Sequence, residues 1–431
     1  MTNKLITIDS HSVATKNSPT ASLLGRGLNN LKSKANVIGV NDLEVTYRQA
    51  RDAYNLITDY GITSHFDPGR ISSKNERVDE LAQQLQPLCE LINQLKDHFI
   101  IFQQLADQSF GKAYFPLALM YSGGQGIDEN AGKSHFYFKK AFKWSTNNSE
   151  LLNIETWTDL GYIYTYGKGV EPKHDEAFTC YSRAAKQDYP SAQHALGHRF
   201  YFGRGIEKDY KQALYWYQKS ADQGFRCAQS EIGEFYCMSG NDGLAFFWHL
   251  KAADQGSAWS QYRIGNIYRD GCGVEQNDEL ALFWYQKAAN QGNDWSQEQL
   301  GDMYRDGSGV EQNDVLAFFW YQKAADKGNY FFSWGDAQNQ LGDMYREGRG
   351  VEQNDVLAFF WFQRTAEDDD PYSQSQLGDM YKEGRGVERD HELALFWYQR
   401  AADQGYDRSQ KKLADMYRDG YVLGPADLRY T

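Results

Sequence analysis

Two histidines of this chain have a spacing typical of metal ligands. His194 and His198 lie four residues apart in the segment HALGH, so a helix would place both imidazoles on one face. A zinc-protease helix carries the pattern His-Glu-x-x-His, and HALGH lacks that glutamate. The sequence shows no third ligand either. We therefore expect no metal ion and no cofactor.

The other patterns of reactive residue types do not predict catalysis. The glycine pairs Gly167/Gly169 and Gly203/Gly205 are not followed by the Lys-Ser/Thr of a phosphate loop. The tripeptide 368–370, three aspartates before a proline, indicates a loop with helix-capping residues. No Ser-His-Asp or Cys-His set can be assembled. We expect no catalytic residue and no enzymatic activity, and a hydrolase is the least favoured class.

The charge of the chain excludes one class of partner. The 431 residues carry a formal net charge of −13. Binding to a phosphate backbone needs an excess of Lys and Arg that releases counterions, and this chain has none. We therefore expect no nucleic-acid binding, and a soluble protein of this charge favours basic partners.

The cysteines and the apolar segments of the sequence indicate in which cellular compartment the protein is expected. The cysteines are odd in number and do not recur at one repeat position, which favours reduced thiols over a disulfide framework. They are Cys89, Cys180, Cys227, Cys237 and Cys272. No stretch approaches the roughly 20 apolar residues of a membrane span, and the first residues lack a signal-peptide run. We expect a cytoplasmic protein without membrane insertion, with secretion without a cleavable signal peptide as the alternative.

One phrase recurs along most of the chain. It reads Leu-Gly-x-x-Tyr, then a glycine-rich turn, then Trp-Tyr-Gln-Lys-Ala-Ala. We call the residue after the leucine the anchor, and successive anchors are mostly 36 residues apart. A fixed step of this size predicts a stacked array of one small unit. The anchors are Gly161, Gly197, Gly233, Gly265, Gly301, Gly342 and Gly378, with Ala118 and Ala414 in degenerate copies.

Each repeat is predicted to form two helices, called helix A and helix B. In the unit that starts at Ser296, the small anchor Gly301 lets a neighbouring helix approach helix A closely. The turn contains glycines suited to positive φ, and Asn313 or Asp314 is the expected N-cap of helix B. One broad apolar face of helix B is formed by Ala317, Trp320, Tyr321, Ala324 and Ala325. Around Gly240 one unit lacks about four turn residues, which predicts a tighter turn.

These residues resemble the Sel1-like repeat family, a relative of the tetratricopeptide repeats. The match is Ser/Ala-Gln-x-x-Leu-Gly-x-x-Tyr, Gly-x-Gly-Val, then Ala-x-x-Trp-Tyr-x-Lys-Ala-Ala, eight or nine times in register. The resemblance implies an all-α fold, a right-handed α-α solenoid of about eight to nine helix pairs with helix A on the concave face. It also implies a scaffold or adaptor role. Some secreted members carry a disulfide in each repeat, and the lack of paired cysteines here favours an intracellular member.

The predicted domain organisation has four parts. Residues 1–40 form a flexible N-terminal tail, 41–98 a helical N-terminal region, 99–420 the repeat solenoid and 421–431 a C-terminal tail. A heptad pattern runs along 81–102. This seam is predicted to pack on the first repeat, and self-association through it is the alternative.

The candidate binding surface is one side of helix A. Relative to the anchor, positions −6, −3, −2, +1 and +5 lie opposite the apolar side. In the middle repeats they hold acidic residues and two tryptophans one repeat apart, and aromatics on a polar surface are hot-spot candidates. The candidate residues are Trp259, Tyr262, Trp295, Glu298, Asp302, Asp306, Asp343, Glu347, Tyr372, Asp379 and Glu383.

Two interpretations of the acidic residues stay open. They form a groove for a basic peptide, or they pair along each helix with neighbouring cations in a solvated face. Those cations are Arg269, Arg305, Arg346, Lys382 and Arg418. A longer step between Gly301 and Gly342 adds an aromatic loop that caps a repeat edge or forms a second contact patch. Its residues are Tyr330, Phe331, Phe332 and Trp334.

The function expected from these features is a non-catalytic bacterial scaffold or adaptor that binds a partner protein or peptide along the concave face. The alternatives are an immunity-type protein that neutralises a bacterial toxin and a secreted effector that binds a host protein.

Overall fold

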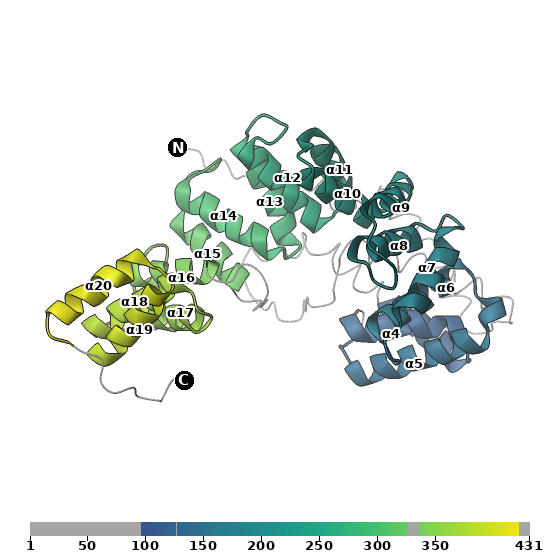
Figure 1. The fold of residues 1–431 in the computed structure, drawn as a ribbon, viewed down its shortest axis with the longest axis horizontal. Coiled ribbons are helices and arrows are strands. Elements are labelled where there is room, and N and C mark those ends of the chain that lie inside the picture. The colour runs from purple at the N-terminus through teal and green to yellow at the C-terminus, as the bar shows by residue number, and fades with distance from the viewer. Residues whose placement is uncertain (1–95, 126, 326–335, 422–431) are drawn as a thin grey trace, which may run out of the picture. The chain divides into compact units, whose positions relative to one another are not determined.

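The structure is a computed structural model that describes residues 96–125, 127–325 and 336–421. Within these ranges the regular secondary structure is entirely helical, so the predicted all-α fold is confirmed (Figure 1). The expected N-terminal tail, nearly all of the 41–98 region and the loop 330–334 lie outside the described residues. The seam 81–102 is described only from residue 96, where residues 96–107 are helical.

The described helices divide between two compact units. The first comprises residues 96–239 together with Asp254–Ser257. It contains two short 3-10 helices, η3 (Gly111–Ala113) and η4 (Ser149–Leu151). Its α-helices are α4 (Tyr114–Gly123), α5 (Ala131–Asn147), α6 (Ile154–Tyr166), α7 (His174–Ala185), α8 (Pro190–Phe202), α9 (Tyr210–Asp222) and α10 (Arg226–Met238).

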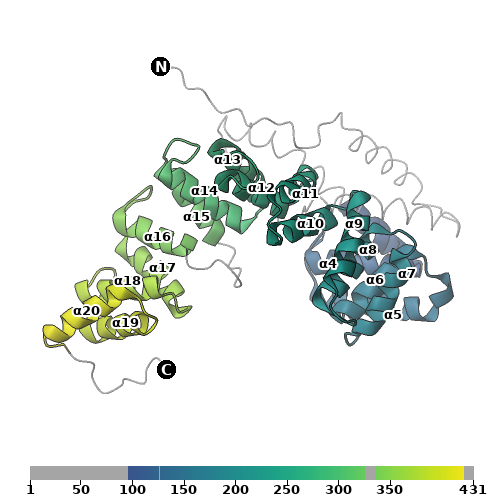
Figure 2. The same cartoon turned by 45° about the horizontal axis from the view of Figure 1, so that its top comes forward.

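The second unit comprises Gly240–Ala253 and the described residues from Ala258 to 421. Its helices are α11 (Asp242–Asp254), α12 (Ala258–Asp270), α13 (Asp278–Asn290), α14 (Asp294–Asp306), α15 (Asp314–Ala325), α16 (Asp336–Glu347), α17 (Asp355–Glu367), α18 (Pro371–Glu383), α19 (His391–Asp403) and α20 (Asp407–Arg418). Even-numbered helices are the predicted A helices and odd-numbered ones the B helices. Pairs such as α18 and α19 lie side by side in both views (Figures 1 and 2).

The anchor glycine is where the two helices of a repeat meet. A Cβ atom on Gly301 of α14 would lie 2.5 Å from Cε1 of Tyr321 on α15, far inside a normal contact. The buried aromatic ring of helix B therefore needs a residue without a side chain beneath it. The same contact recurs at Gly161, Gly197, Gly265, Gly342 and Gly378.

The turn between the two helices also depends on glycine. Gly307 and Gly309 have φ values of 74° and 67°, in the left-handed region. A Cβ on Gly309 would lie 2.5 Å from the backbone carbonyl carbon of Asp278, at the start of the preceding helix B. The turn thus sets how closely successive repeats stack. The expected N-cap is Asn313, whose Oδ1 accepts a hydrogen bond from the Leu316 amide at 3.0 Å.

A glutamine four residues before the anchor connects successive repeats. Gln261 Nε2 donates to the Ala253 carbonyl at the end of the preceding helix B, at 3.1 Å. Its Oε1 accepts from Gln291 Nε2 of the following turn at 2.7 Å. Both bonds satisfy polar groups that the stack buries. Equivalent donations to a helix B carbonyl are made by Gln193, Gln229, Gln297 and Gln374.

Two irregular segments behave as the sequence predicts. Only residues 239–241 separate α10 from α11, which is the tighter turn expected around Gly240, and Gly240 takes a φ of 72°. In the 368–370 segment, Asp370 caps α18 by accepting from the Ser373 amide at 2.7 Å. Asp369 adopts a φ of 66° at a position where other repeats place glycine, and it pairs with Arg400.

Cys180 is predicted to resist alkylation in the native protein. It lies in the core at the position where other repeats place a buried tryptophan such as Trp284, and burial raises the pKa of its thiol to about 12. Cys272 is exposed and serves as the internal control. Native iodoacetamide labelling followed by peptide mass spectrometry should modify Cys272 and leave Cys180 unmodified until denaturant is added. Equal native labelling of both thiols would show that Cys180 is not in the core.

Within the described residues, none of the helices combines the length and the apolar character that crossing a lipid bilayer requires.

Candidate functional site

The structure brings three of the predicted aromatic residues into one cluster in the second unit. Trp259 and Trp295 lie in the first turns of α12 and α14, and their ring centroids are 5.2 Å apart in an edge-to-face arrangement. Tyr262 packs 5.4 Å from Trp259 and 5.9 Å from Trp295. We call these three residues the aromatic cluster. Their contact shows that these equivalent positions of two successive A helices are adjacent.

Members of the aromatic cluster differ in exposure. Trp295 retains 36% of its surface, whereas Trp259 and Tyr262 are half-buried. The guanidinium of Arg263 lies 5.8 Å from the centroid of the Trp259 ring. The cluster therefore combines close ring contacts within the chain with one tryptophan that remains exposed.

Six of the predicted acidic residues have cationic partners within the chain. Arg305 pairs with Asp302 at 3.0 Å and with Asp306 at 2.8 Å. Arg346 pairs with Glu347 at 2.7 Å. In the last repeats, Asp379 pairs with Lys412 at 2.6 Å and Glu383 pairs with Arg385 at 2.9 Å.

Arg269, Arg305 and Arg346 pair with acids of their own helix, as one of the two interpretations predicts. Asp379 and Glu383 instead pair with Lys412 and Arg385, which lie outside their helix. Exposed pairs of this kind stabilise little. They nevertheless reduce the net negative charge that the acidic residues present to a partner.

Two of the predicted surface acids are buried. Glu298 and Asp343 each retain only 8% of their surface. Asp343 accepts hydrogen bonds from the Tyr372 hydroxyl at 2.7 and 2.9 Å and pairs with Arg346 at 2.6 Å. Asp343 does not lie on an open surface because Tyr372 of the following repeat, itself a predicted site residue, contacts it.

In other repeats, a tyrosine of helix B donates a hydrogen bond to the residue that follows the anchor. The Tyr321 hydroxyl donates to Asp302 at 2.7 Å, and the Tyr398 hydroxyl donates to Asp379 at the same distance. In the repeat of Asp343, Phe362 replaces that tyrosine, and the next repeat supplies Tyr372 instead. Burial raises the pKa of the Asp343 carboxyl, while the Tyr372 hydrogen bond and Arg346 lower it.

Helix B of the second unit carries an exposed apolar row that the sequence analysis did not single out. Phe247, Phe283, Phe319 and Phe360 retain 43% to 52% of their surface. Lysines four residues later cover three of these rings, as Lys287 does at 4.5 Å from the Phe283 centroid. Through these cation–π contacts, three of the four phenylalanine rings each contact a lysine of their own helix.

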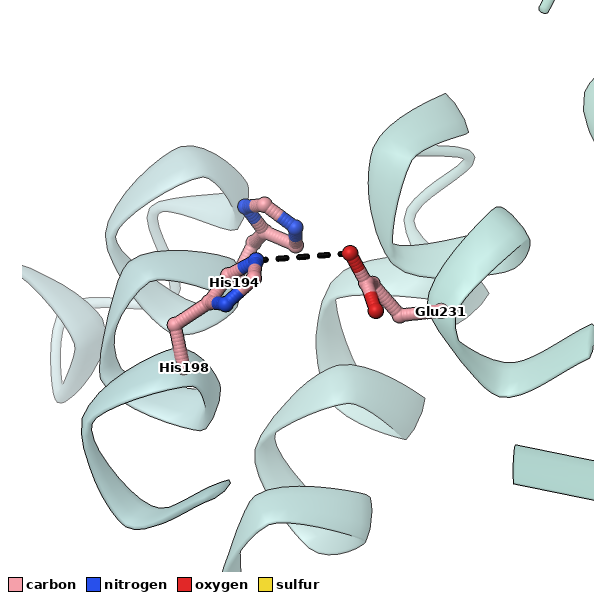
Figure 3. A group of neighbouring side chains, drawn as sticks. All are labelled: His194, His198 and Glu231. Atoms are coloured by element: carbon pink, nitrogen blue, oxygen red, sulfur yellow. Dashed lines mark ion pairs between the residues drawn. The ribbon is translucent and has the colours of Figure 1, made fainter. Parts of the chain in front are cut away.

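The first unit contains a histidine cluster, of which the sequence indicated the two histidines but not the third residue. His194 and His198 lie on successive turns of α8 and face Glu231 of α10 (Figure 3). His198 Nε2 is 3.4 Å from Glu231 Oε1, and one ligand atom from each of the three residues lies within 4.8 Å of the others. Glu231 is the third potential ligand that the sequence analysis did not find.

The surroundings of this histidine cluster are aromatic and partly enclosed. A pocket of about 530 Å³ is lined by both histidines together with Tyr166, Phe202 and Phe225. Burial lowers the pKa of His194 to about 3, and the nearby His198 imidazole lowers it too, so the His194 ring is neutral at physiological pH. Its Nε2 atom is buried without a hydrogen-bond partner.

Sequence and structure comparisons agree on one kind of repeat. The family model described as Sel1 repeat matches eight segments, 111–143, 158–189, 190–225, 228–257, 260–293, 296–329, 335–370 and 371–406. A Sel1 repeat protein from Oxalobacter formigenes is 26% identical, with 82% of this chain and 98% of that chain covered and a TM-score of 0.51. No curated protein matches this chain significantly in sequence.

Two further solved structures are similar at lower scores. A protective antigen of uropathogenic Escherichia coli strains, with an SLR fold, is 24% identical over 82% of this chain and 85% of its own, at a TM-score of 0.47. An immunity protein from Pseudomonas aeruginosa is 20% identical over 50% of this chain and 83% of its own, at a TM-score of 0.33. At these scores neither similarity transfers a function to this chain.

Proposed function

Because this chain belongs to the Sel1 repeat family, we propose that it is a non-catalytic scaffold that binds another protein or peptide. The binding surface is the row of A helices in the second unit, and its centre is the aromatic cluster of Trp259, Tyr262 and Trp295. Stacked repeats of this kind are rigid supports that present one side chain per repeat at regular intervals. A partner with an extended or helical segment can contact several repeats at once.

The observation that carries this proposal is the exposure of Trp295 within a packed aromatic group. A tryptophan that retains 36% of its surface while touching two other rings is held in one orientation. Such a residue loses little conformational entropy on binding and offers a large apolar area. Aromatic side chains that a partner covers on binding supply much of the binding energy of protein interfaces.

The exposed carboxylates at the ends of the A helices would be the polar part of this surface. Asp306, Glu347 and Glu383 remain exposed beside their arginine partners. A basic partner would compete with those arginines for the carboxylates, so each new ion pair gains little. We therefore propose that apolar contacts supply most of the affinity and that a preference for basic segments is secondary.

Replacing both tryptophans by alanine should weaken binding of the partner at least tenfold, because two anchor side chains are lost. The partner is first identified by cross-linking in the source cells, and its Kd is then measured with purified proteins. Trp259→Ala/Trp295→Ala is compared with Phe283→Ala/Phe319→Ala, which removes two exposed rings from the B helices of the same repeats. The phenylalanine variant should bind like the wild type.

Further measurements make this test decisive. Both variants should unfold cooperatively, and raising the salt concentration should change the wild-type Kd by less than tenfold. Loss of cooperative unfolding in the tryptophan variant would show that these rings are core. Equal weakening by both variants would place the partner elsewhere, and steep salt dependence would contradict the secondary role of charge.

A further inference from the structure

We propose that His194, His198 and Glu231 bind one divalent metal ion of the Zn²⁺ class in the first unit. Two imidazole nitrogens and a carboxylate oxygen are a ligand set that Zn²⁺ accepts, with the fourth position left to water or another ligand. The proposal goes beyond scaffold function and uses no residue of the aromatic cluster. Figure 3 shows the three side chains, two from one helix and one from its neighbour.

The separation of the side chains suits a shared ion. The distance from His198 Nε2 to Glu231 Oε1 is 3.4 Å. Two ligands bound tetrahedrally at zinc distances of about 2.1 Å would be about 3.4 Å apart. A direct N–H···O hydrogen bond is usually shorter, at roughly 2.7 to 3.2 Å. The 3.4 Å separation therefore fits two ligands of one tetrahedral ion.

His194 gives an independent reason to expect a ligand. Its Nε2 atom is buried and lacks a hydrogen-bond partner, as does the hydroxyl of Tyr217, whose ring centroid is 5.7 Å from that of His194. Buried polar atoms are normally paired, so an orphaned atom beside two other metal-ligating groups points to a missing species. A metal ion at this place would coordinate a ring nitrogen that has no other partner.

An equivalent place in the second unit is occupied by a cation. There Lys412 Nζ contacts Ser375 Oγ at 3.2 Å and Asp379 Oδ2 at 2.6 Å. Ser375 and Asp379 are the −3 and +1 positions of their repeat, as His194 and His198 are of theirs, and Lys412 corresponds to Glu231. The first unit thus replaces a lysine and its two acceptors by three acceptors. An external cation restores the missing positive charge.

Access for the ion is provided by the pocket of about 530 Å³ that both histidines line. The side chains of His198 and Glu231 also keep 36% and 38% of their surface, so the ion does not have to enter a closed core. Room beside the ligands also accommodates the fourth ligand of the ion.

The test is titration of the full chain with Zn²⁺ and Co²⁺ after dialysis against a chelator. Calorimetry should show one high-affinity equivalent, and Co²⁺ should give the visible absorption of a four-coordinate complex. His198→Gln and Glu231→Gln should each weaken binding at least about tenfold, as the loss of a ligand must exceed the loss of a supporting contact. His135→Gln, which removes an exposed histidine of α5, should have no effect.

Thermal unfolding supplies a second readout. Zn²⁺ should raise the Tm of the wild type and of the His135 variant but not that of Glu231→Gln, because only a folded site binds the ion. Circular dichroism of the Glu231 variant should match that of the wild type, since its side chain is partly exposed. Absence of stoichiometric binding, or binding that both ligand variants leave unchanged, would overturn the proposal.

Discussion

Replacing Gly301 by alanine should lower the free energy of unfolding by about 2 kcal/mol, although alanine is the better helix former. The added Cβ would lie 2.5 Å from the Tyr321 ring. That ring is fully buried, and its hydroxyl forms hydrogen bonds with Asp302 and Arg305. The ring therefore cannot move aside to make room for the added Cβ. The two helices of the repeat must then separate, which loosens the surrounding core. Urea unfolding monitored by circular dichroism measures the change.

Gly243 provides the matched control for this substitution. It lies in α11, and a Cβ there would meet no atom within 4 Å. Gly243→Ala should therefore stabilise the protein by about 0.5 kcal/mol through helix propensity alone. The two substitutions have the same chemistry and opposite expected signs. A double-mutant cycle with Tyr321→Ala completes the test, since the cost of Gly301→Ala should fall when the ring is absent. An unchanged cost would mean that the ring contact is not its cause.

Much of the fold could be predicted because residues close together in each repeat determine its local structure. The period of about 36 residues, the small anchor Gly301, the glycine turn and the cap Asn313 are all set by residues within one unit. Repetition in register then makes a weak local signal strong. The contact between Trp259 and Trp295 could also be expected, because equivalent positions of stacked units are neighbours.

The burial of Glu298 and Asp343 could not be predicted in this way. Both occupy positions that a single helix would expose, and the structure buries both. Tyr372, which binds Asp343, lies 29 residues further along the chain. Which acid is buried thus depends on side chains of another repeat. The helical periodicity of one repeat carries no information about them.

The third residue of the histidine cluster was within reach of sequence reasoning. The +1 position of one repeat faces the −2 position of the next, as the pair of Asp379 and Lys412 shows. The same rule applied to His198 leads to Glu231, 33 residues later. The spacing of ligands along one helix indicates only the two histidines. In repeat proteins, ligand spacing has to be read across the period as well as along the helix.

Replacing Asp343 by alanine should lower the free energy of unfolding by about 3 kcal/mol, the cost typical of breaking a buried pair. Its side chain keeps 12% of its surface and that of Arg346 keeps 18%, so the pair is largely shielded from water, and Arg346 would keep only its pair with Glu347. The Tyr372 hydroxyl also loses its acceptor. The matched control is Asp302→Ala, because the Asp302 side chain keeps 35% of its surface. That variant should cost only about 1 kcal/mol, and equal costs would contradict the role of burial.

Asp343→Asn separates the shape of this side chain from its charge. The amide oxygen can still accept from Tyr372, so this variant should cost less than alanine. Because burial raises the folded-state pKa of Asp343, the folded chain binds its proton more tightly than the unfolded chain does. The resulting stability is present below the ordinary aspartate pKa and is lost as the pH rises through the raised value. Wild-type stability relative to Asp343→Asn should therefore decrease from acidic to neutral pH, and a difference independent of pH would show that the pKa is not shifted.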